Sequence, residues 1–486
     1  MTQLSTQPLC DLLIVGAGPA GMAAAIEARR AGLQVIVADE GEALGGQIYR
    51  NLGHSPLADA HVLGDDYLAG RDLIERFDAS GARLLSRASV WQIAFEDGRA
   101  VAMLTRRPHG ADAGGTLDIA ARAVLVATGA QERPWPVRGW TLPGVMGVGA
   151  AQTLLKSSGL APSRDAVLAG CGPLLWLFAS QLLNAGRQVR AIIDTTPRDA
   201  WRAAFPHALP ALAGADYLLK GVRMMRVVKR AGIPVHRGAR AVSIEGEAHA
   251  ERVRFTDEHG VPRAIDTSLV LLHQGVIPST QLARSLGCEH RWDTASACWR
   301  PRTDARGRSS VEHVWIAGDS AGIGGAKAAA LAGTLAALDI ARELGVLDAP
   351  MRDARSRPAL RALKRHLAVR PLLDALYTPR AALRRPADDV IVCRCEEITA
   401  GEVRGIAALG CQGPNQMKAF SRCGMGPCQG RWCGTTVGEL IAQVQERPVA
   451  EVGYYRIRAP IKPVTVDEIA DSIALDEDFT RGEFPS

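Results

Sequence analysis

Cysteine is the residue type whose spacing points most clearly to chemistry in this 486-residue chain, because six of its ten cysteines fall between Cys393 and Cys433. Cys393 and Cys395 form a C-x-C pair, and Cys423, Cys428 and Cys433 follow with C-x4-C-x4-C spacing. Soft thiolates at such short spacing bind zinc or an iron–sulfur cluster. The C-x-C pair is shorter than the C-x2-4-C of most zinc sites, and glycines among the later cysteines expose N–H groups for cluster sulfides. The sequence therefore favours an iron–sulfur cluster over zinc.

Five cysteines thus compete for four ligand positions. The sixth, Cys411, stands apart from the others and is predicted to be a buried thiol. A short strand at 390–392 precedes the C-x-C pair, and a helix at 399–410 separates it from the later cysteines. The chain between the two groups must fold back for one metal site to hold them.

A second chemical signal is the motif GAGPAG at residues 16–21. An apolar strand at 12–15 precedes it, an alanine-rich helix at 22–31 follows, and a second strand at 35–38 ends at Asp39. The three glycines of a G-x-G-x-x-G turn give a tight turn, close approach of a pyrophosphate and close helix packing, and the acid accepts from a ribose hydroxyl. This context predicts dinucleotide binding rather than incidental glycines. The expected contacts are Gly16, Gly18, Pro19, Ala20, Gly21, Asp39 and Glu40.

Three later turns are candidates for the same ligand. The paired glycines of GGQIYR at 45–50 would let the backbone run against a flat ring or a phosphate, although a surface turn explains them equally well. A buried strand at 123–127 ends in Thr-Gly, and a strand at 314–317 ends in Gly-Asp beside a helix N-terminus, where flavin ribityl and phosphate groups would be held; a helix cap is the alternative. The expected contacts are Gly46, Gln47, Thr128, Gly129, Gly318, Asp319 and Lys327.

A second strand–turn–helix unit begins at residue 166 and turns at Gly170 and Gly172. Leu175 occupies the third glycine position, where a bulky side chain would hold the helix off the strand and crowd a pyrophosphate. The sequence therefore favours a vestigial or adenylate-only site over a working NAD(P)H site. His273, in a buried strand at 269–278, is expected to be a hydrogen-bonded structural residue rather than a cofactor contact.

Length and composition limit the remaining functions. A chain of 486 residues, 47% hydrophobic and 22% charged, predicts a globular α/β protein of two to four domains. Its formal charge of +6 is spread along the chain, so nucleic-acid binding is not expected. No apolar run is long enough to cross a membrane, and no signal peptide precedes the first strand. We expect a cytoplasmic protein, either free or peripherally associated with the inner membrane.

Two segments fall outside these motifs. Residues 200–236 predict a helical insertion. Its basic residues Lys220, Arg223, Arg226, Lys229 and Arg230 are interpreted as a solvated helix face. Residues 352–385 are arginine-rich with scattered prolines and predict a linker with one or two amphipathic helices, either a solvated connector or a docking surface for a partner subunit.

Thiol–disulfide reductase chemistry is excluded because the cysteines of the nucleotide-binding halves are too scattered to form a dithiol beside a flavin. No residue is predicted to be a catalytic base.

Together these motifs carry a resemblance to a known family. The turns at 16–21, 45–50, 128–134, 139–145 and 318–319, with CRC at 393–395 and GMGPCQGRWC at 424–433, resemble the A (alpha) subunit of opine oxidases and of the similar hydroxyproline or proline dehydrogenase and hydrogen cyanide synthase complexes. The resemblance extends to RIRAPIKP at 456–463. It covers nearly the whole chain.

The resemblance implies an α/β, two-dinucleotide-binding-domain flavoprotein, Rossmann-like and doubly wound, with a small C-terminal [2Fe-2S] domain of the bacterioferritin-associated-ferredoxin type. The implied parts are an FAD-binding domain at 1–125 and 269–345, a second nucleotide-binding-like domain at 126–268, a basic linker at 346–388, the [2Fe-2S] domain at 389–445 and a tail at 446–486.

The resemblance also implies a function. This subunit would accept electrons from a separate FAD-dependent beta subunit that oxidises an amine or imino acid, and pass them through FAD and a [2Fe-2S] cluster to an external acceptor. Some relatives carry an FMN between subunits, and some a small third subunit. The alternatives are a stand-alone NAD(P)H-dependent flavin and iron–sulfur reductase, and a non-enzymatic metal-binding or docking subunit.

On this resemblance the cluster ligands are Cys393, Cys395, Cys428 and Cys433, with Cys423 as the reserve. We therefore predict that Cys423→Ser leaves the iron content of the purified protein unchanged, because the variant retains four thiolates. Iron analysis and the visible absorbance of the cluster check this. Loss of cluster absorbance in this variant would overturn the assignment.

Overall fold

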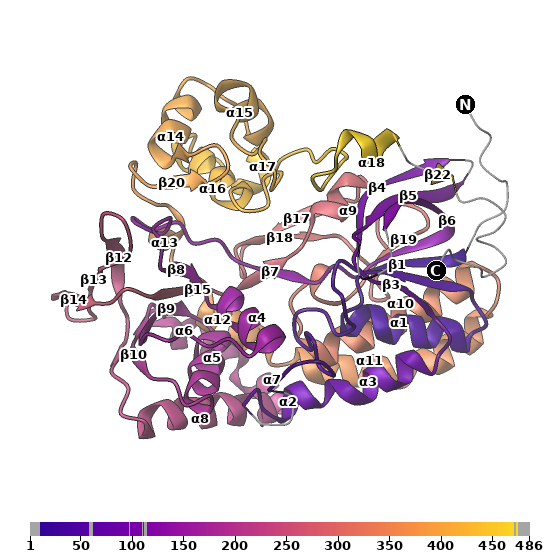
Figure 1. Cartoon of the computed structure of the whole chain (residues 1–486), viewed down its shortest axis with the longest axis horizontal. Helices are drawn as coiled ribbons and strands as arrows, with labels where there is room; N and C mark the ends of the chain where they lie inside the picture. Colours follow the sequence, from indigo (N-terminus) through magenta and orange to yellow (C-terminus); the bar gives the residue numbers. More distant parts are fainter. Residues whose placement is uncertain are drawn as a thin grey trace.

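The computed structural model of the chain describes residues 10–57, 62–96, 98–108, 110, 114–470 and 473–474, so the predicted tail at 446–486 lies partly outside the described residues. Two sheets dominate this part of the chain (Figure 1). The larger sheet runs in the order β3 (Arg83–Leu85), β2 (Val35–Ala38), β1 (Cys10–Val15), β6 (Gly115–Val126), β5 (Arg99–Arg106) and β4 (Ala88–Glu96), with β19 (Val314–Ile316) and β22 (Ile473–Ala474) also paired to β6.

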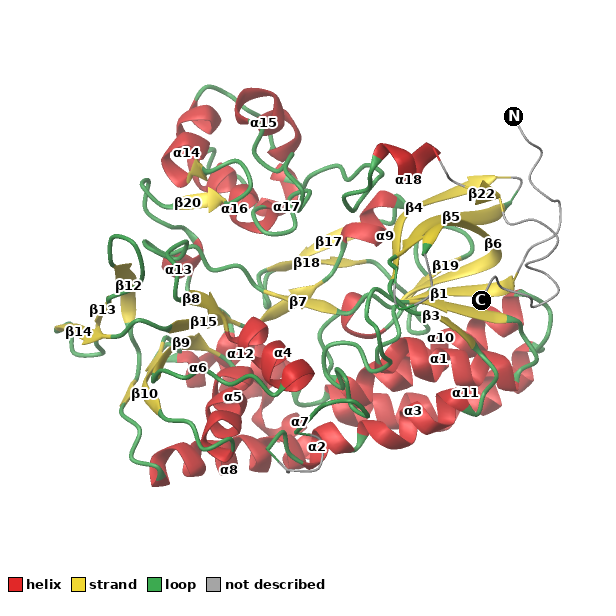
Figure 2. Cartoon of the chain, in the orientation of Figure 1, coloured by secondary structure: helices red, strands yellow, loops and turns green. Residues whose placement is uncertain are grey.

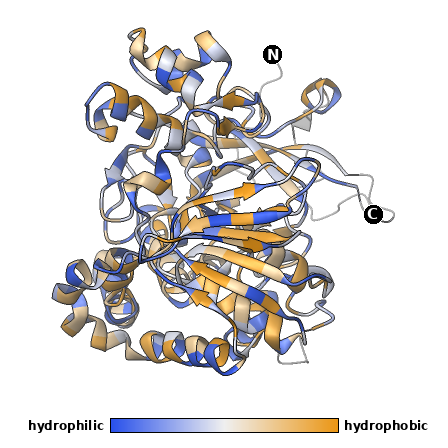
Figure 3. Cartoon of the chain, turned by 90° about the vertical axis from the view of Figure 1, so that its left-hand side faces the viewer, coloured by the Kyte–Doolittle hydropathy of each residue, from blue (hydrophilic) through white to orange (hydrophobic). Residues whose placement is uncertain are grey.

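Strand β6 joins two kinds of pairing in the larger sheet. Its first half pairs antiparallel with β5, and its second half pairs in parallel with β1 and β19. Residues 123–126 at the end of the parallel half are all buried, as expected of a strand covered on both faces. Figure 3 shows strands that are hydrophobic over much of their length, with hydrophilic segments among them.

Helices cover one face of this sheet (Figure 2). They are α1 (Pro19–Arg30), α3 (Gly70–Asp78), α10 (Ala326–Glu343) and α11 (Ala349–Leu367), with the short α2 (Asp65–Leu68) before α3. Small residues let α1 and α10 approach closely: a Cβ added to Gly333 of α10 would lie 2.0 Å from the backbone oxygen of Ala20 in α1. Helix α10 begins at Ala326, directly after the glycine-containing segment 322–325.

The smaller sheet is wholly parallel, in the order β11 (Val235–His236), β10 (Val189–Asp194), β9 (Ala166–Cys171), β15 (Val270–Gln274) and β8 (Val145–Gly147). Helices α4 (Val148–Ser158), α5 (Pro173–Asn184) and α8 (Ala215–Arg230) accompany it. The strand predicted at 269–278 breaks at Gly275, which has a φ of +81°, so that β16 (Val276–Pro278) turns away to pair with β7 (Ala130–Glu132).

Three small antiparallel units complete the strands of these two halves. They are the meander β12 (Arg240–Glu245), β13 (Arg252–Thr256) and β14 (Pro262–Asp266), the hairpin β17 (His290–Asp293) and β18 (Cys298–Pro301), and the pair β16–β7. The short helix α9 (Gln281–Ser285) lies between β16 and β17.

The insertion between β10 and β11 is helical, as predicted. It comprises α6 (Ala200–Ala204), α7 (Ala208–Ala211), two short 3-10 turns and α8. Of the basic residues predicted to form a solvated face, Lys220 is half-buried and pairs with Asp66 of α2. The others, Arg223, Arg226, Lys229 and Arg230, are exposed. The sequence did not predict that large apolar side chains would be exposed beside them: Trp201, Phe205, Leu209, Leu212 and Leu219 are each more than half exposed.

The predicted linker is almost entirely helical. Helix α11 leads into α12 (Arg370–Tyr377) and α13 (Ala381–Arg384), and these connect to a C-terminal body. That body contains β20 (Ile391–Cys393), β21 (Ile398–Thr399), α14 (Ala400–Ala408), α15 (Pro414–Ser421), α16 (Gly434–Val444) and α17 (Val449–Val452), with α18 (Val466–Ala470) beyond it. A capping box between Thr399 and Glu402 starts α14.

The C-terminal body shares one hydrophobic core with the larger sheet. Buried residues of that sheet, such as Leu13 and Val124, belong to the same cluster as Val403 and Ile441 of the body. The chain after the body returns to the sheet, where the Ile461 amide donates to the Trp91 oxygen of β4 at 2.8 Å. In the part of the chain that the structure describes, no helix is both long and apolar enough to span a membrane.

A buried ion pair ties the connector to the C-terminal body. Arg384 of α13 pairs with Glu439 of α16, whose side chain is 2% exposed. We predict that Arg384→Met lowers the unfolding free energy by about 3 kcal/mol, because it leaves the buried Glu439 carboxylate without its ion-pair partner.

Thermal and urea unfolding of this variant would be compared with that of Arg385→Met, which removes an exposed arginine one residue further on. Equal stability of the two variants would contradict this role of the ion pair.

Candidate functional site

The GAGPAG turn lies where β1, β6 and β19 end side by side. Gly16 has a φ of +111°, and a Cβ there would lie 2.4 Å from the backbone oxygen of Ala127. A Cβ on Gly21 would lie 1.8 Å from the oxygen of Gly16. Both contacts are shorter than any real Cβ contact, so the turn tolerates only glycine at these positions.

The N-terminus of α1 is open to a ligand. Gly18 is its N-cap residue and offers no side-chain cap, and Pro19 and Ala20 form the first turn. Gly46, predicted as a contact, packs its backbone against Gly18, since a Cβ on Gly46 would lie 2.9 Å from the Gly18 Cα. Gly318 reaches the same place, because its Cβ would lie 2.7 Å from that of Ala20. The structure therefore brings these predicted contacts together around one helix N-terminus, an arrangement that suits a phosphate.

Asp39 lies at the end of β2, as predicted, and both of its carboxylate oxygens accept from the backbone. The Ala17 amide donates to one at 2.5 Å and the Gly41 amide to the other at 2.6 Å. Burial raises the pKa of Asp39 above its usual value, and these two hydrogen bonds oppose that rise. Glu40, in contrast, accepts from Ser89 and pairs with Lys462 at 2.6 Å, so its carboxylate is engaged with the edge of the sheet.

Of the remaining predicted contacts, Asp319, Thr128 and Gly129 form hydrogen bonds with the backbone, and Lys327 is exposed. Asp319 accepts from the amides of Gly324 and Gly325 at 2.8 and 3.0 Å, which is the capping role expected as the alternative. Thr128 donates to the Ser279 oxygen, and the Gly129 oxygen accepts from the Ser279 amide. Lys327 is exposed on the first turn of α10.

Lys156 is a site residue that the sequence analysis missed. It is a buried lysine of α4 whose ammonium donates to the backbone oxygen of Gln47, in the predicted GGQ contact, at 3.0 Å. Burial, aided by the charge of Arg50, lowers the pKa of Lys156 to about 7. The only local signal was polar Gln152 and Lys156, four residues apart, on an otherwise apolar helix face.

The second glycine turn is crowded by its neighbours. A Cβ on Gly170 would lie 1.6 Å from the His273 backbone oxygen, and the imidazole of His273 faces Gly172. The expected hydrogen bond of His273 is confirmed: its Nδ1 lies 2.5 Å from the Glu132 carboxylate. Leu175 is fully buried in the core, and the thiol of Cys171 donates to the Tyr377 oxygen at the end of α12.

The cysteines predicted to bind a cluster gather in the C-terminal body, in two groups. The sulfur atoms of Cys393, Cys423 and Cys433 all lie within 4.8 Å of one another, and all three residues are buried. Cys395 and Cys428 lie against each other nearer the surface. Cys411 is a buried thiol, as predicted. The Cys423 sulfur therefore lies together with those of Cys393 and Cys433, although the family resemblance makes Cys423 only the reserve ligand.

Hydrogen bonds among the three buried cysteines favour deprotonation of Cys393. Hydrogen bonds from the thiols of Cys423 and Cys433 lower the pKa of Cys393 to about 2. The same sharing with Cys393 raises the pKa of Cys423 to about 12. A thiolate held by neighbouring thiols is ready to bind a metal ion, since metal ligands must be deprotonated.

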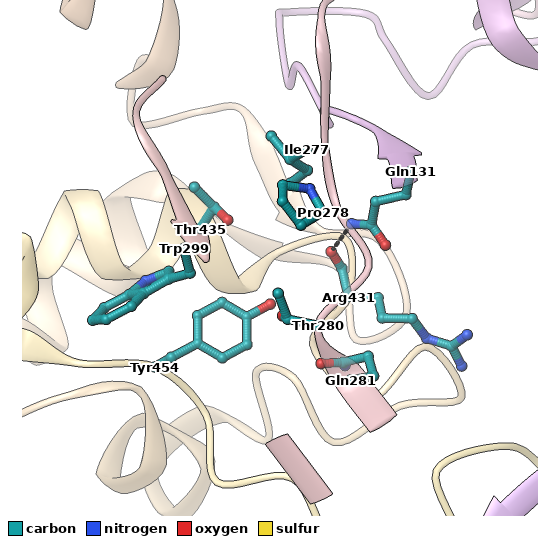
Figure 4. Close-up of a pocket in the computed structure, with 9 residues that line it drawn as sticks. All are labelled: Gln131, Ile277, Pro278, Thr280, Gln281, Trp299, Arg431, Thr435 and Tyr454. Carbon is teal, nitrogen blue, oxygen red and sulfur yellow. Dashed lines mark hydrogen bonds between the residues drawn. The ribbon is translucent and has the colours of Figure 1, made fainter. Parts of the chain in front are cut away.

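Residues 423–433, which carry the later cysteines and form the cysteine loop, are hydrogen-bonded to segments that follow the first nucleotide-binding turn. The side-chain amide of Gln131, two residues after Gly129, donates to the Arg431 backbone oxygen at 2.8 Å (Figure 4). The side-chain amide of Gln281 donates to the Gln429 oxygen at 2.7 Å. These two hydrogen bonds fix the cysteine loop to β7, which follows the Thr128-Gly129 turn, and to α9.

Comparison with known families first defines the class. Residues 10–334 match the pyridine nucleotide-disulphide oxidoreductase family, and residues 390–472 match the sarcosine oxidase A3 domain. The chain is therefore an oxidoreductase in which a pyridine nucleotide-disulphide oxidoreductase domain precedes a cysteine-bearing domain.

Individual relatives then define the family. The chain is 46% identical to the A subunit of opine oxidase from Rhizobium meliloti, over 95% of this chain and 87% of that protein. It is 33% identical to the HcnB subunit of hydrogen cyanide synthase from Pseudomonas aeruginosa, over 93% of this chain and 96% of that protein. The chain belongs to the family of opine oxidase A subunits, as the motifs predict.

A solved structure agrees on the fold. The crystal structure of L-proline dehydrogenase from P. horikoshii superposes with a TM-score of 0.68 at 19% identity, over 95% of this chain and 79% of that chain.

The lowered pKa of Lys156 gives a pH-dependent prediction. Between about pH 7 and 10 the unfolded state holds a proton on this lysine that the folded state lacks, so wild-type stability rises with pH by up to about 1.4 kcal/mol per unit. Lys156→Met removes this dependence, and its stability relative to wild type should increase as the pH falls from 10 to 7.

Urea unfolding at several pH values measures this difference. Lys229→Met, at an exposed position of α8, is the control and should differ from wild type by a constant amount. Parallel pH profiles of Lys156→Met and wild type would contradict the burial of a neutral lysine.

Proposed function

We propose that this chain is the FAD- and [2Fe-2S]-containing electron-transfer subunit of a multi-subunit dehydrogenase that acts on CH–NH bonds of an opine, hydroxyproline or proline-type substrate. A substrate-oxidising beta subunit supplies the electrons, and an external acceptor receives them. The observation that carries the proposal is the docking of the cysteine loop, through Gln131 and Gln281, beside the nucleotide-binding turn. This contact would hold the two proposed redox sites of the chain near each other.

The residues of the first turn fit an FAD. Gly16 and Gly21 allow close backbone approach, and the uncapped N-terminus of α1 offers N–H groups and a positive dipole end to a pyrophosphate. Asp39 holds the turn by accepting from Ala17 and retains lone pairs for a ribose hydroxyl. Lys156 holds the GGQ loop in place through the Gln47 oxygen.

The cysteine residues fit a [2Fe-2S] cluster, with Cys393, Cys395, Cys428 and Cys433 as the proposed ligands. Cys393 and Cys433 belong to the buried group, and Cys395 and Cys428 close the site toward the surface. A bound FAD would supply two-electron chemistry and the cluster one-electron transfer. The protein excludes water from the buried cysteines and offers glycine amides around them.

The architecture disfavours two other activities. The buried thiols of Cys10 and Cys171 have their pKa raised to about 12 by burial, so neither is a nucleophile for disulfide exchange. The second glycine turn, closed by His273 and by the end of α12, disfavours a nicotinamide nucleotide as the electron donor. Association with a partner chain is supported by the relatives, two of which are named as components of multi-subunit enzymes.

The test is anaerobic reduction of the purified complex. We expect iron, acid-labile sulfide and flavin in the chain, and loss of flavin absorbance on adding octopine, hydroxyproline, proline or glycine only when the partner subunit is present. The chain alone, with the same amines and with NADPH, is the control.

Three results would count against the proposal. Reduction of the chain alone by an amine would place substrate oxidation in this subunit. Rapid reduction by NADPH alone would favour a stand-alone reductase, and a colourless protein would favour a non-enzymatic docking role.

A further inference from the structure

Tyr455 lies inside the cysteine loop rather than beside it. The residue is 2% exposed, and two glycines with positive φ lie against its ring. A Cβ on Gly424 would lie 2.4 Å from the ring carbon that bears the hydroxyl, and a Cβ on Gly430 would lie 2.5 Å from the opposite ring edge. Both glycines are therefore required for the ring to occupy this position.

The position of the Tyr455 ring places its hydroxyl group beside two cysteine sulfur atoms. The Tyr455 O–H donates to the Cys423 sulfur at 3.4 Å, and the Cys433 sulfur lies 3.8 Å from the same oxygen. These are the two sulfur atoms that lie closest to Cys393. One of them, Cys433, belongs to the proposed ligand set.

The neighbouring tyrosine shows that this contact is specific. Tyr454 is half-buried, and its hydroxyl donates to the backbone oxygen of Gly430 at 3.1 Å. Its ring packs against Tyr455 and Trp299 and under the guanidinium of Arg284. The two adjacent tyrosines thus differ in the atom that their hydroxyl groups contact, a backbone oxygen for Tyr454 and sulfur for Tyr455.

We propose that Tyr455 is a positioning residue that sets the reduction equilibrium of the sulfur-ligated centre. Its hydroxyl group donates to the Cys423 sulfur and accepts from the Cys433 thiol, and it would donate to the Cys433 sulfur once that residue is a thiolate ligand. The proposal rests on the proposed function, since it requires a cluster in this loop. Reduction places additional negative charge on the cluster and its sulfur ligands. A hydrogen bond to sulfur stabilises that charge more in the reduced state than in the oxidised state, and so favours reduction.

The test is Tyr455→Phe in the complete complex. Phenylalanine keeps the ring between the two glycines and removes only the hydroxyl group. We expect iron and acid-labile sulfide to be unchanged and the ratio of reduced to oxidised cluster, at a fixed ambient potential, to fall about tenfold, which corresponds to a potential about 59 mV lower for one electron. Spectroelectrochemical titration of the cluster absorbance measures this ratio.

Tyr454→Phe is the matched control, because it removes a hydroxyl group from the adjacent residue without touching sulfur. We expect its cluster potential to match that of wild type. Resonance Raman bands of the iron–sulfur bonds should shift in D2O for wild type and Tyr454→Phe, and the shift should be smaller in Tyr455→Phe, where only the backbone N–H donors remain.

Three outcomes would overturn the proposal. They are an unchanged potential in Tyr455→Phe, an equal shift in both tyrosine variants, and loss of iron in Tyr455→Phe, which would make the hydroxyl group a requirement for assembly. A wild-type protein without iron and sulfide would instead contradict the proposed function itself, so the two failures are distinguishable.

Discussion

The rest of the structure depends on one close backbone approach. Gly16 lies against the end of β6 so tightly that the Ala127 oxygen leaves no room for a Cβ, and Gly21 lies equally close to the Gly16 oxygen. This constraint holds the ends of β1 and β6 and the start of α1 within one turn. The chain that leaves β6 therefore emerges beside the nucleotide site, and residues 128–132 run from there toward the cysteine loop.

The C-terminal body is fixed to this edge by hydrogen bonds and by a shared core. Gln131 and Gln281 donate to backbone oxygens on either side of Gly430, and the body contributes buried residues to the core of the larger sheet. Because the contacts involve backbone oxygens of the cysteine loop, they constrain the loop itself. The shape of the loop and its distance from the nucleotide site are thus determined together.

Local sequence patterns predicted the glycine turn at 16–21 well. The strand–turn–helix at 12–31 depends on neighbours in sequence, so Gly16, Gly18, Gly21 and Asp39 lie where the pattern places them. Glu40 differs, because its partners Ser89 and Lys462 come from distant segments.

The cysteine spacing predicted a sulfur-rich site but could not order its members, since the fold of α14 and α15 decides which sulfur atoms meet. Lys156 and Tyr455 also depend on long-range contacts: Lys156 bonds to a residue 109 positions away, and Tyr455 reaches Cys423 across 32 positions. Neither residue type stands out locally.

The central claim is that this chain carries electrons away from a reaction that another subunit performs. The most direct measurement is rapid anaerobic mixing of the complex containing Cys433→Ser with its amine substrate, followed by addition of an artificial electron acceptor. We predict that the partner's flavin is reduced at the wild-type rate in the first turnover while reduction of the acceptor stops. Slowed flavin reduction in that first turnover, or undiminished reduction of the acceptor, would contradict this claim.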